Sequence, residues 1–464
     1  MARDDIPTSR LQRSATIGRL ATGTAVKQLA TRTANVVRGD EASREALGRR
    51  QVETAEQIVA VLGTMKGAAM KLGQVMSFLD VGLVPEEYRD EFQRKLAQLR
   101  DSAPTVAFAE MRKVLEGEHG ERLEETFAEF EPEPIAAASI GQVYRARLHD
   151  GRVVAVKVQY PGAAAAVRAD LQNFGMLVRL MSRLAPELDA KDIAEEVRER
   201  ISEELDYELE AANQRSLARI YAGHPFILVP DVVTSYSGER VLVTEYVQGT
   251  GFEELKQRSQ AERDRVAEIV FRFYFGCMYR HHQFSGDPHP GNFLLLDDGR
   301  VAFLDFGLFK RIDASIAEFE LELARRAISG DTEGLIEQLR TGGFLRDANR
   351  YGSEGIAQQF FDVTWWYTRD AEVELTPEIA TQVIIDMSDP RSRHYKQMRH
   401  ENLPREHLFG RRTETLTLAV MAQLRARGNW HRIAREWIFN DPPVTELGRA
   451  EAGPWSGCGD GLAG

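Results

Sequence analysis

The sequence predicts an α+β fold with two lobes, a small one that contains a sheet and a larger helical one, behind a helical extension. Strand-like runs with alternating apolar residues gather between about residues 131 and 250, and helical patterns dominate on either side. The chain has 464 residues, which is more than one ordinary core holds. Five segments are predicted: a basic amphipathic segment (1–50), a helical extension (51–130), a sheet lobe with a helical insertion (131–250), a helical lobe (251–440) and a flexible tail (441–464).

Composition places the chain among globular proteins, because 43% of its residues are hydrophobic and 28% are charged. A net charge of −12 disfavours nucleic acid as a partner, since phosphate binding needs a concentrated basic face. Neither of the two cysteines, Cys277 and Cys458, lies in a cluster typical of disulfides or zinc. No apolar run is long enough for a signal peptide or a membrane span, so a cytoplasmic location is expected.

Residues 1–50 are locally basic, with ten Lys and Arg against five acids. Between residues 10 and 37 apolar residues recur at helical spacing among the basic ones, which predicts an amphipathic helix. The first interpretation is a helix packed on the domain. The alternative is a helix on a partner or a membrane surface, which would place the protein at the inner face of the membrane.

The sheet lobe is predicted element by element. The run VAFAEMRKVLEGEHG after Pro104 predicts a helix, and the prolines of FAEFEPEPIAAAS indicate an extended link into a sheet. Strands are predicted in SIGQVYRARL, RVVAVKVQ, FILVPDVVTSY and RVLVTEYV. Further on, the turn DDG separates two short apolar runs in GNFLLLDDGRVAFLDFG, which predicts a β-hairpin.

Two loops flank that hairpin and carry the strongest chemical pattern. The segment GDPHPGN holds Asp287 and Asn292, and the triplet DFG begins at Asp305. Phosphoryl transfer needs oxygen ligands that hold Mg²⁺ against the nucleotide phosphates and a separate carboxylate that faces the attacking group. Either motif alone commonly occurs by chance, as loop residues that cap a turn. Both motifs, in this order around a hairpin, favour the chemical interpretation.

Two upstream features are consistent with a nucleotide site. Lys157 lies on a strand among valines, where its ammonium could pair with phosphate oxygens. The strand that ends at Glu245 and Val247, before a glycine, resembles a hinge whose backbone binds adenine. Each feature has a structural alternative, a surface lysine in the first case and a strand that ends in a turn in the second.

The stretch from residue 136 to residue 143 aligns with the phosphate-loop pattern GxGxxGxV, but alanines replace the first two glycines. Lys157 follows fourteen positions after Val143. Each alanine Cβ restricts the backbone and crowds its approach to phosphates, so the alanines should alter how ATP is held without abolishing binding. The predicted nucleotide contacts in this loop are Ala136, Ala137, Ala138, Ser139, Gly141 and Val143.

The motifs AAASIGQVYRA, VAVKV, ELDY, DPHPGN and DFG, preceded by MKLGQ, together resemble the UbiB/AarF-domain (ABC1-type) atypical kinase family. The resemblance covers most of the chain. It implies a protein-kinase-like bilobal fold whose N-terminal helical extension carries a KxGQ motif. It also implies ATP and Mg²⁺ as cofactors and a role in isoprenoid-quinone or related lipid metabolism.

The resemblance implies roles for single residues. Lys157 would hold the phosphates and pair with Glu210, Asp287 would be the catalytic-loop aspartate, and Asn292 and Asp305 would bind Mg²⁺. The KxGQ residues would cover the cleft that receives peptides in protein kinases, and the ExD acids would meet them there. These residues are Lys71, Gly73 and Gln74 for KxGQ, and Glu204 and Asp206 for ExD. Two structural alternatives stay open: close packing for the KxGQ helix and a solvated face for the acidic run EELDYELE.

The catalytic loop departs from that of ordinary protein kinases. It reads Ser285-Gly286-Asp287 in place of His-Arg-Asp, so no arginine at that position could receive an activation-loop phosphate. His289 lies inside the loop, and we expect it to be a loop hydrogen-bonder because Mg²⁺ prefers oxygen ligands.

The expected function is Mg²⁺-dependent ATP binding with hydrolysis or phosphoryl transfer to a small or lipid acceptor, such as an isoprenoid or quinone precursor. Two alternatives stay open at this point. One is a protein kinase that acts on other proteins, and the other is a nucleotide-binding pseudokinase scaffold. The presence of Lys157, Asp287, Asn292 and Asp305 argues against an inactive scaffold.

Overall fold

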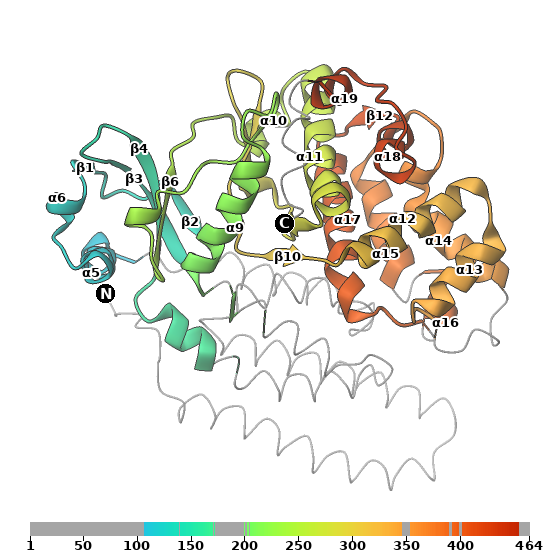
Figure 1. Ribbon diagram of the computed structural model, residues 1–464, viewed down its shortest axis with the longest axis horizontal. Helices are drawn as coiled ribbons and strands as arrows, with labels where there is room; N and C mark the ends of the chain where they lie inside the picture. Colours follow the sequence, from blue (N-terminus) through green and yellow to red (C-terminus); the bar gives the residue numbers. More distant parts are fainter. Residues whose placement is uncertain are drawn as a thin grey trace, which may run out of the picture. The chain divides into compact units, whose positions relative to one another are not determined.

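The computed structural model describes residues 106–138, 140–169, 171, 199, 202–203, 205–345, 353–388, 392–398 and 401–453. The chain divides into two compact units (Figure 1). The first unit comprises residues 1–149 and 156–205, and the second comprises residues 150–155 and 206–464. Several predictions lie outside the described residues, namely those for the basic N-terminal segment, Lys71, Gly73, Gln74, Ser139 and Glu204.

In the first unit the helix at residues 108–119 and the strand at residues 141–147 lie where the sequence predicts them. Its described elements are α5 (Phe108–His119), α6 (Leu123–Thr126), β1 (Glu129–Phe130), β2 (Ala136–Ala138) and β3 (Gly141–Arg147). Strand β3 pairs antiparallel with both β1 and β2. The rings of Phe108, Phe130 and Tyr144 lie with centroids 5.4–5.6 Å apart, which ties α5 to these strands.

Strand β4 (Val153–Gln159) is shared by the two units, because its first three residues belong to the second unit and the rest to the first. Its valines at 154, 156 and 158 are buried, as the alternating pattern predicts for a strand with one face on a core. The strand order in this sheet is β1-β3-β4-β6, with β2 also paired to β3.

The second unit contains three short β structures besides β6 (Val241–Glu245). The DDG turn forms the predicted hairpin, because β8 (Phe293–Leu295) and β9 (Val301–Phe303) pair antiparallel with Phe293 opposite Phe303. Strand β5 (Ile227–Leu228) pairs parallel with β9. Strands β7 (Gln283–Ser285) and β10 (Phe309–Arg311) form a second antiparallel pair, and β11 (Val373–Glu374) pairs with β12 (Arg427–Gly428).

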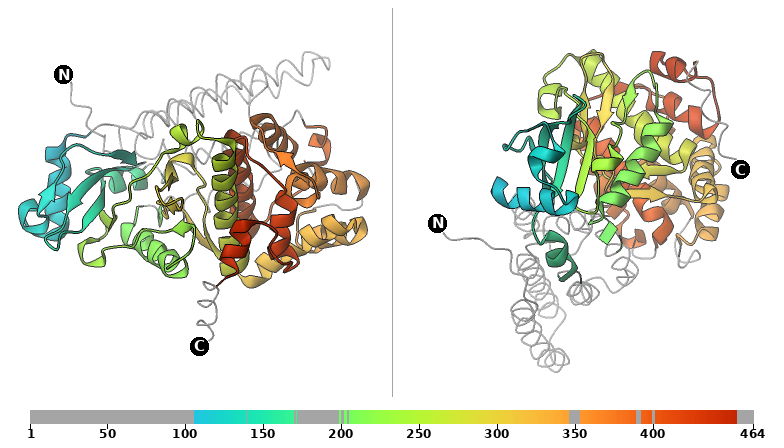
Figure 2. Two further views of the ribbon diagram at one scale, coloured as in Figure 1. Left: turned by 90° about the horizontal axis from the view of Figure 1, so that it is seen from above. Right: turned by 60° about the vertical axis from the view of Figure 1, so that its left-hand side comes forward.

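Helices make up most of the second unit. They are α9 (Tyr207–Ile220), α10 (Phe252–Leu255), α11 (Gln260–His281), α12 (Ala314–Ser329), α13 (Thr332–Thr341), α14 (Ser353–Thr368), α15 (Pro377–Ser388), α16 (Tyr395–Met398), α17 (Arg405–Gln423), α18 (Trp430–Ile438) and α19 (Glu446–Glu451). Within this unit, Figures 1 and 2 show α11 between α9 on one side and the helices α12 to α15 on the other.

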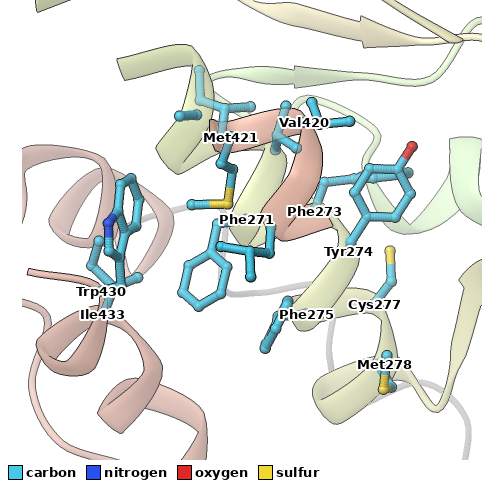
Figure 3. Packing of buried hydrophobic residues seen from close by; sticks show 14 of the residues in the cluster. Phe271, Phe273, Tyr274, Phe275, Cys277, Met278, Val420, Met421, Trp430 and Ile433 are labelled. Atoms are coloured by element: carbon cyan, nitrogen blue, oxygen red, sulfur yellow. The ribbon is translucent and has the colours of Figure 1, made fainter. Parts of the chain in front are cut away.

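Helix α11 is apolar almost all round its C-terminal half, which is the pattern of a helix buried in a core. Phe271 packs edge-on against Trp430 of α18 with ring centroids 5.8 Å apart, and Phe273 stacks on Phe303 of β9 at 3.7 Å. Met421 of α17 completes this cluster (Figure 3). The core therefore holds α11 rigidly between the hairpin strands and the later helices.

The start of the expected flexible tail is ordered, which corrects the sequence prediction for residues 441–453. Thr445 caps α19 by accepting the Gly448 N–H at 3.0 Å, and Leu447 is buried. Glu451 forms a 2.8 Å ion pair with Arg272 of α11. The Gly and Pro content of the segment hid these long-range contacts. Residues 454–464 lie outside the described part.

A search of the described residues for a membrane-spanning helix gives none of sufficient length and hydropathy.

Candidate active site

The two predicted chemical loops lie side by side in the second unit. Strand β7 leads into the first loop and β10 leaves the second, and the two strands pair with Ser285 opposite Phe309. The Gly286 N–H donates to the Leu308 carbonyl at 2.6 Å, and the Ser285 hydroxyl donates to the Asp305 carbonyl at 3.2 Å. The strand pair therefore fixes the catalytic loop against the DFG segment.

Asp287 and Asn292 are bonded to each other within the catalytic loop. The Asn292 side-chain amide donates to the Asp287 carbonyl at 3.0 Å and to its Oδ2 at 3.3 Å. His289 closes the loop between them, because its Nδ1 accepts the Gly291 N–H at 3.1 Å and its carbonyl accepts the Asn292 N–H at 2.9 Å. The predicted role of His289 as a loop hydrogen-bonder is confirmed.

Asn292 also lies beside the DFG segment. Its carbonyl accepts the Leu304 N–H at 2.9 Å, so the backbone of Asn292 is bonded to the residue before Asp305. Asp305 Oδ1 accepts the Gly307 N–H at 3.0 Å, and Phe306 is fully buried. These bonds anchor the DFG turn and bring an amide and a carboxylate to the same end of the hairpin.

This donor set fits Mg²⁺. Because its NH₂ group is bonded to Asp287, the Oδ1 of Asn292 is directed away from that residue, and within the described residues it accepts no hydrogen bond. An amide oxygen and the Asp305 carboxylate are hard ligands, and phosphates and water usually supply the rest of a Mg²⁺ shell. In the described part of the chain no three His, Cys, Asp or Glu residues converge as a self-sufficient metal site.

Tyr274 of α11 shares the electrostatic environment of both loops. Burial, followed by the negative charges of Asp287 and Asp305, raises the pKa of Tyr274 well above its ordinary value. The phenol therefore stays protonated at physiological pH and adds no charge beside the two carboxylates.

Arg412 of α17 reaches the catalytic loop from a distant part of the chain. Its guanidinium donates to the Gly286 carbonyl at 2.5 Å and lies 3.7 Å from Asp287 Oδ1. The Arg412 and Asp287 side chains are 12% and 16% exposed, so this pair is largely shielded from water. The sequence analysis missed this residue, since no motif spacing links it to a loop 126 positions earlier.

The hinge-like segment follows β6 in the same unit. The Tyr246 N–H donates to the Val153 carbonyl at 3.1 Å, and the Glu245 carboxylate accepts the Asp231 N–H at 3.1 Å. The Val247 N–H makes no hydrogen bond within the described residues. A free backbone donor at this position is what a hinge needs in order to bind a base edge.

The hinge continues into a segment that is fixed to β8, the strand after Asn292. Thr250 and Leu295 exchange two backbone hydrogen bonds of 2.7 and 3.0 Å. The chain passes so close at Gly249 that an added Cβ would lie 2.7 Å from the Leu295 carbonyl oxygen. The glycine therefore permits a contact that places the hinge segment beside the catalytic strands.

The alanine-rich stretch of the first unit is a strand. Ala136, Ala137 and Ala138 form β2, which pairs with β3 so that Ala138 lies opposite Gly141 and Ala136 opposite Val143. Ala136 and Ala137 are exposed and Ala138 is half-buried. Lys157 is half-buried on β4 between two buried valines, as the alternation predicts.

Two acids of the EELDYELE run, Asp206 and Glu210, differ in environment. Asp206 is exposed and caps α9 by accepting the Leu209 N–H at 3.1 Å. Glu210, one turn into the same helix, is 2% exposed. Burial of a carboxylate is costly without a compensating partner, so the environment of Glu210 is typical of a specific ionic role. Its predicted pairing with Lys157 stays a prediction.

Comparison with known proteins identifies the family. Residues 98–339, more than half of the chain, match the ABC1 atypical kinase-like domain. The chain belongs to this family. The ABC1 assignment confirms the resemblance seen in the sequence motifs and the predicted kinase-like fold class.

Three individual proteins illustrate the relationship. Over 73% of its length the chain is 32% identical to the atypical kinase COQ8B, mitochondrial, of Rattus norvegicus and 30% identical to the atypical kinase coq-8, mitochondrial, of Caenorhabditis elegans. It spans 64% and 46% of those two proteins. A solved structure of Rv3197 from Mycobacterium tuberculosis in complex with erythromycin superposes with a TM-score of 0.61 at 30% identity, covering 87% of this chain and all of that one.

Proposed function

We propose that this ABC1-family protein binds ATP with Mg²⁺ and either hydrolyses it or transfers its terminal phosphoryl group to a small or lipid acceptor. One observation carries the proposal. Asp287 and Asn292 are bonded to each other, and Asn292 is bonded through its backbone to the residue before Asp305. Three side chains of the required chemistry are therefore held at one end of a single hairpin.

Each of these side chains has a separate proposed role. Asp287 accepts a proton from the attacking hydroxyl or water, and Arg412 and Asn292 hold it in place. Asn292 and Asp305 hold Mg²⁺ through oxygen atoms. The ion would neutralise charge on the nucleotide phosphates. The Val247 N–H receives the adenine edge, and Lys157 supplies a cation for the phosphates.

The proposed acceptor is an isoprenoid lipid or a quinone precursor. Support comes from the family resemblance and from relatives named as mitochondrial COQ8-type atypical kinases. The KxGQ residues Lys71, Gly73 and Gln74, with the ExD acids Glu204 and Asp206, are proposed to exclude protein substrates. Contact with an anionic membrane is proposed through residues 1–50, because their positive charge contrasts with the acidic remainder of the chain.

Phosphate release from ATP tests the proposal against its alternatives. We expect the full chain to release phosphate with Mg²⁺ and to label a generic peptide poorly. Stabilisation by nucleotide without any turnover would instead indicate a pseudokinase scaffold. Strong peptide labelling would indicate a protein kinase and would contradict the exclusion of protein substrates.

The acceptor needs a test in cells. A strain that lacks the protein should accumulate prenylated quinone precursors, and a plasmid copy of the wild-type gene should reverse the accumulation. A copy that encodes D287N is the matched control, because it removes one carboxylate charge and keeps the residue volume. An unchanged quinone and lipid profile in the deletion strain would contradict the proposed metabolic role.

Membrane contact is tested by flotation with vesicles that contain anionic lipids. Binding should weaken when Arg10, Arg13, Arg19 and Lys27 are replaced by glutamine, because each basic residue near an anionic surface contributes about 1 kcal/mol. Failure of the unaltered chain to float with these vesicles would rule out this contact.

A further inference from the structure

We propose that Arg412 is a positioning residue that holds the catalytic loop in its working conformation and does so without phosphorylation of the chain. The inference rests on the proposed function, since it concerns the same loop. Ordinary protein kinases have an arginine directly before the catalytic aspartate, whereas this chain has Gly286 before Asp287. The loop therefore needs a cation from another part of the chain.

The surroundings of Gly286 show how an arginine from a distant helix reaches the loop. A Cβ on Gly286 would be in van der Waals contact with side-chain atoms of both Leu308 and Phe409, 3.4 Å away, so Phe409 of α17 lies directly beside the loop backbone. Phe409 and Arg412 are three residues apart on α17 and therefore share a face of that helix. The helix brings both the packing side chain and the cation to the loop.

Arg412 makes two kinds of contact with the loop. Its 2.5 Å hydrogen bond to the Gly286 carbonyl fixes the backbone before Asp287, and its charge lies 3.7 Å from the Asp287 carboxylate. Hydrogen bonds with a charged donor are stronger than neutral ones, and burial reduces screening by salt. One side chain therefore contacts both the backbone before Asp287 and the Asp287 side chain.

The element that presents Arg412 is rigid. The neighbouring Arg411 faces another direction and pairs with Glu320 at 2.6 Å and Glu414 at 3.3 Å. Further along α17, Leu418 and Met421 are buried in the main core. Because α17 is fixed on both sides of Arg412, the cation is available to the loop at all times. No added phosphate is needed to recruit it.

The test compares R412Q and R412K with R325Q. Arg325 is a matched control: it donates to the Ile438 carbonyl at 2.7 Å and pairs with Glu318, but it lies on α12 and, among the described residues, has no polar contact with the catalytic loop. We expect R412Q to lower kcat for phosphate release on the order of 10- to 100-fold with little change in KM for ATP. R412K should recover part of the loss, and R325Q should behave like the unaltered chain.

A second readout does not depend on turnover. The amides of Gly286, His289, Gly291 and Asn292 are all hydrogen-bonded within the loop or to Leu308. R412Q should speed their hydrogen exchange about tenfold or more, while exchange in α11 and α18 stays unchanged. If the unaltered chain releases no phosphate, the proposed function fails, but the exchange data still test the role of Arg412.

Three results would overturn the inference. One is equal loss of kcat in R412Q and R325Q, which would indicate general destabilisation. Another is a rise in KM with kcat unchanged, which would place Arg412 in nucleotide binding. The third is unchanged loop exchange in R412Q. If R412Q does not fold, the comparison of R412K with R325Q decides by the same criteria, with thermal unfolding measured for each variant.

Discussion

Two arginines of the second unit lie close to carboxylates, yet they organise very different sites. Arg272 on α11 is fully buried and forms ion pairs of 2.7–2.8 Å with Glu268, Glu436 and Glu451. The guanidinium of Arg412 on α17 lies 3.7 Å from the Asp287 carboxylate. One arginine is enclosed by acids and the other lies beside a partly exposed loop.

The comparison distinguishes an ion-pair cluster that stabilises the fold from a site that can take part in chemistry, although both consist of arginine and carboxylates. Around Arg272 the three carboxylates converge on one guanidinium, so the group closes on itself and fastens α19 to α11. Beside Arg412 the carboxylate of Asp287 is held by longer contacts, 3.3 Å from the Asn292 amide and 3.7 Å from the guanidinium, and within the described residues no cluster of acids closes around the cation. A carboxylate in that state can still exchange a proton or approach a ligand.

The largest expected effect is on catalysis at Asp287. The variant D287N should lower kcat for phosphate release on the order of 1,000-fold, because an amide cannot accept the proton. Thermal unfolding of D287N should change little, since the amide is nearly isosteric. Turnover close to that of the unaltered chain would show that Asp287 does not act as the base.

The largest expected effect on stability is at Arg272. Its replacement by methionine removes the closest cation from three acids, of which Glu436 and Glu451 keep only longer contacts with Arg280, so R272M should lower the free energy of unfolding by about 3–5 kcal/mol. Urea denaturation measures this. The control R340Q removes an arginine whose pair with Glu337 is exposed, and it should have no measurable effect. If R272M and R340Q gave comparable unfolding curves, the buried ion pairs of Arg272 would contribute no more to stability than the exposed pair of Arg340.

The ion pairs of Arg272 with Glu268, Glu436 and Glu451 also predict that the stability of the fold depends on pH. Burial alone would raise the pKa of Glu451, but the His224 ring, 3.6 Å away, and the charges of Arg280 and Arg272 prevail and lower it to about 2. A folded pKa below the unfolded value of 4.5 means that this carboxylate stabilises the fold above pH 4.5. That contribution is lost as the pH falls toward 2.

The variant E451Q tests this dependence. It should be clearly less stable than the unaltered chain at pH 7, and the difference should shrink as the pH falls from about 4.5 toward 2. Urea unfolding at a series of pH values measures it. A difference that does not vary with pH would mean that the charge of Glu451 is irrelevant to stability.

The smallest expected effect concerns the alanine strand of the first unit. Ala138 pairs with Gly141 at the end of β2, and glycine in its place frees the backbone at a cost of roughly 0.5–1 kcal/mol. We expect A138G to shift nucleotide affinity by a few-fold and to raise self-phosphorylation. Unchanged behaviour in both assays would make the alanines ordinary strand residues.

Local patterns in the sequence predicted much of this architecture because they act over short distances. The DDG turn, the valines of β4 and the helix of residues 108–119 each follow from neighbouring residues. The loop motifs likewise predicted that Asn292 and the DFG segment would lie close together, and the Leu304 N–H does donate to the Asn292 carbonyl. This prediction was possible because the hairpin that joins the two loops is short.

The parts that sequence patterns could not predict depend on contacts between distant segments. Arg412 reaches Gly286 across 126 positions, and Arg272 reaches Glu451 across 179. Neither pair leaves a periodic or local signal. The Gly- and Pro-rich segment around Thr445 looked like a loose tail because its partners, Glu268 and Arg272, lie on α11.

The most direct test of the proposed function is the Mg²⁺ dependence of ATP turnover in D305N, with D298N as control. Asp298 lies in the turn of the same β8–β9 hairpin and is half-exposed, and within the described part of the chain its side chain bonds only to Arg300. The proposed function predicts that the unaltered chain and D298N release phosphate only with Mg²⁺. It also predicts that D305N loses turnover at every Mg²⁺ concentration. Metal-dependent turnover in D305N equal to that of D298N would contradict the proposed site.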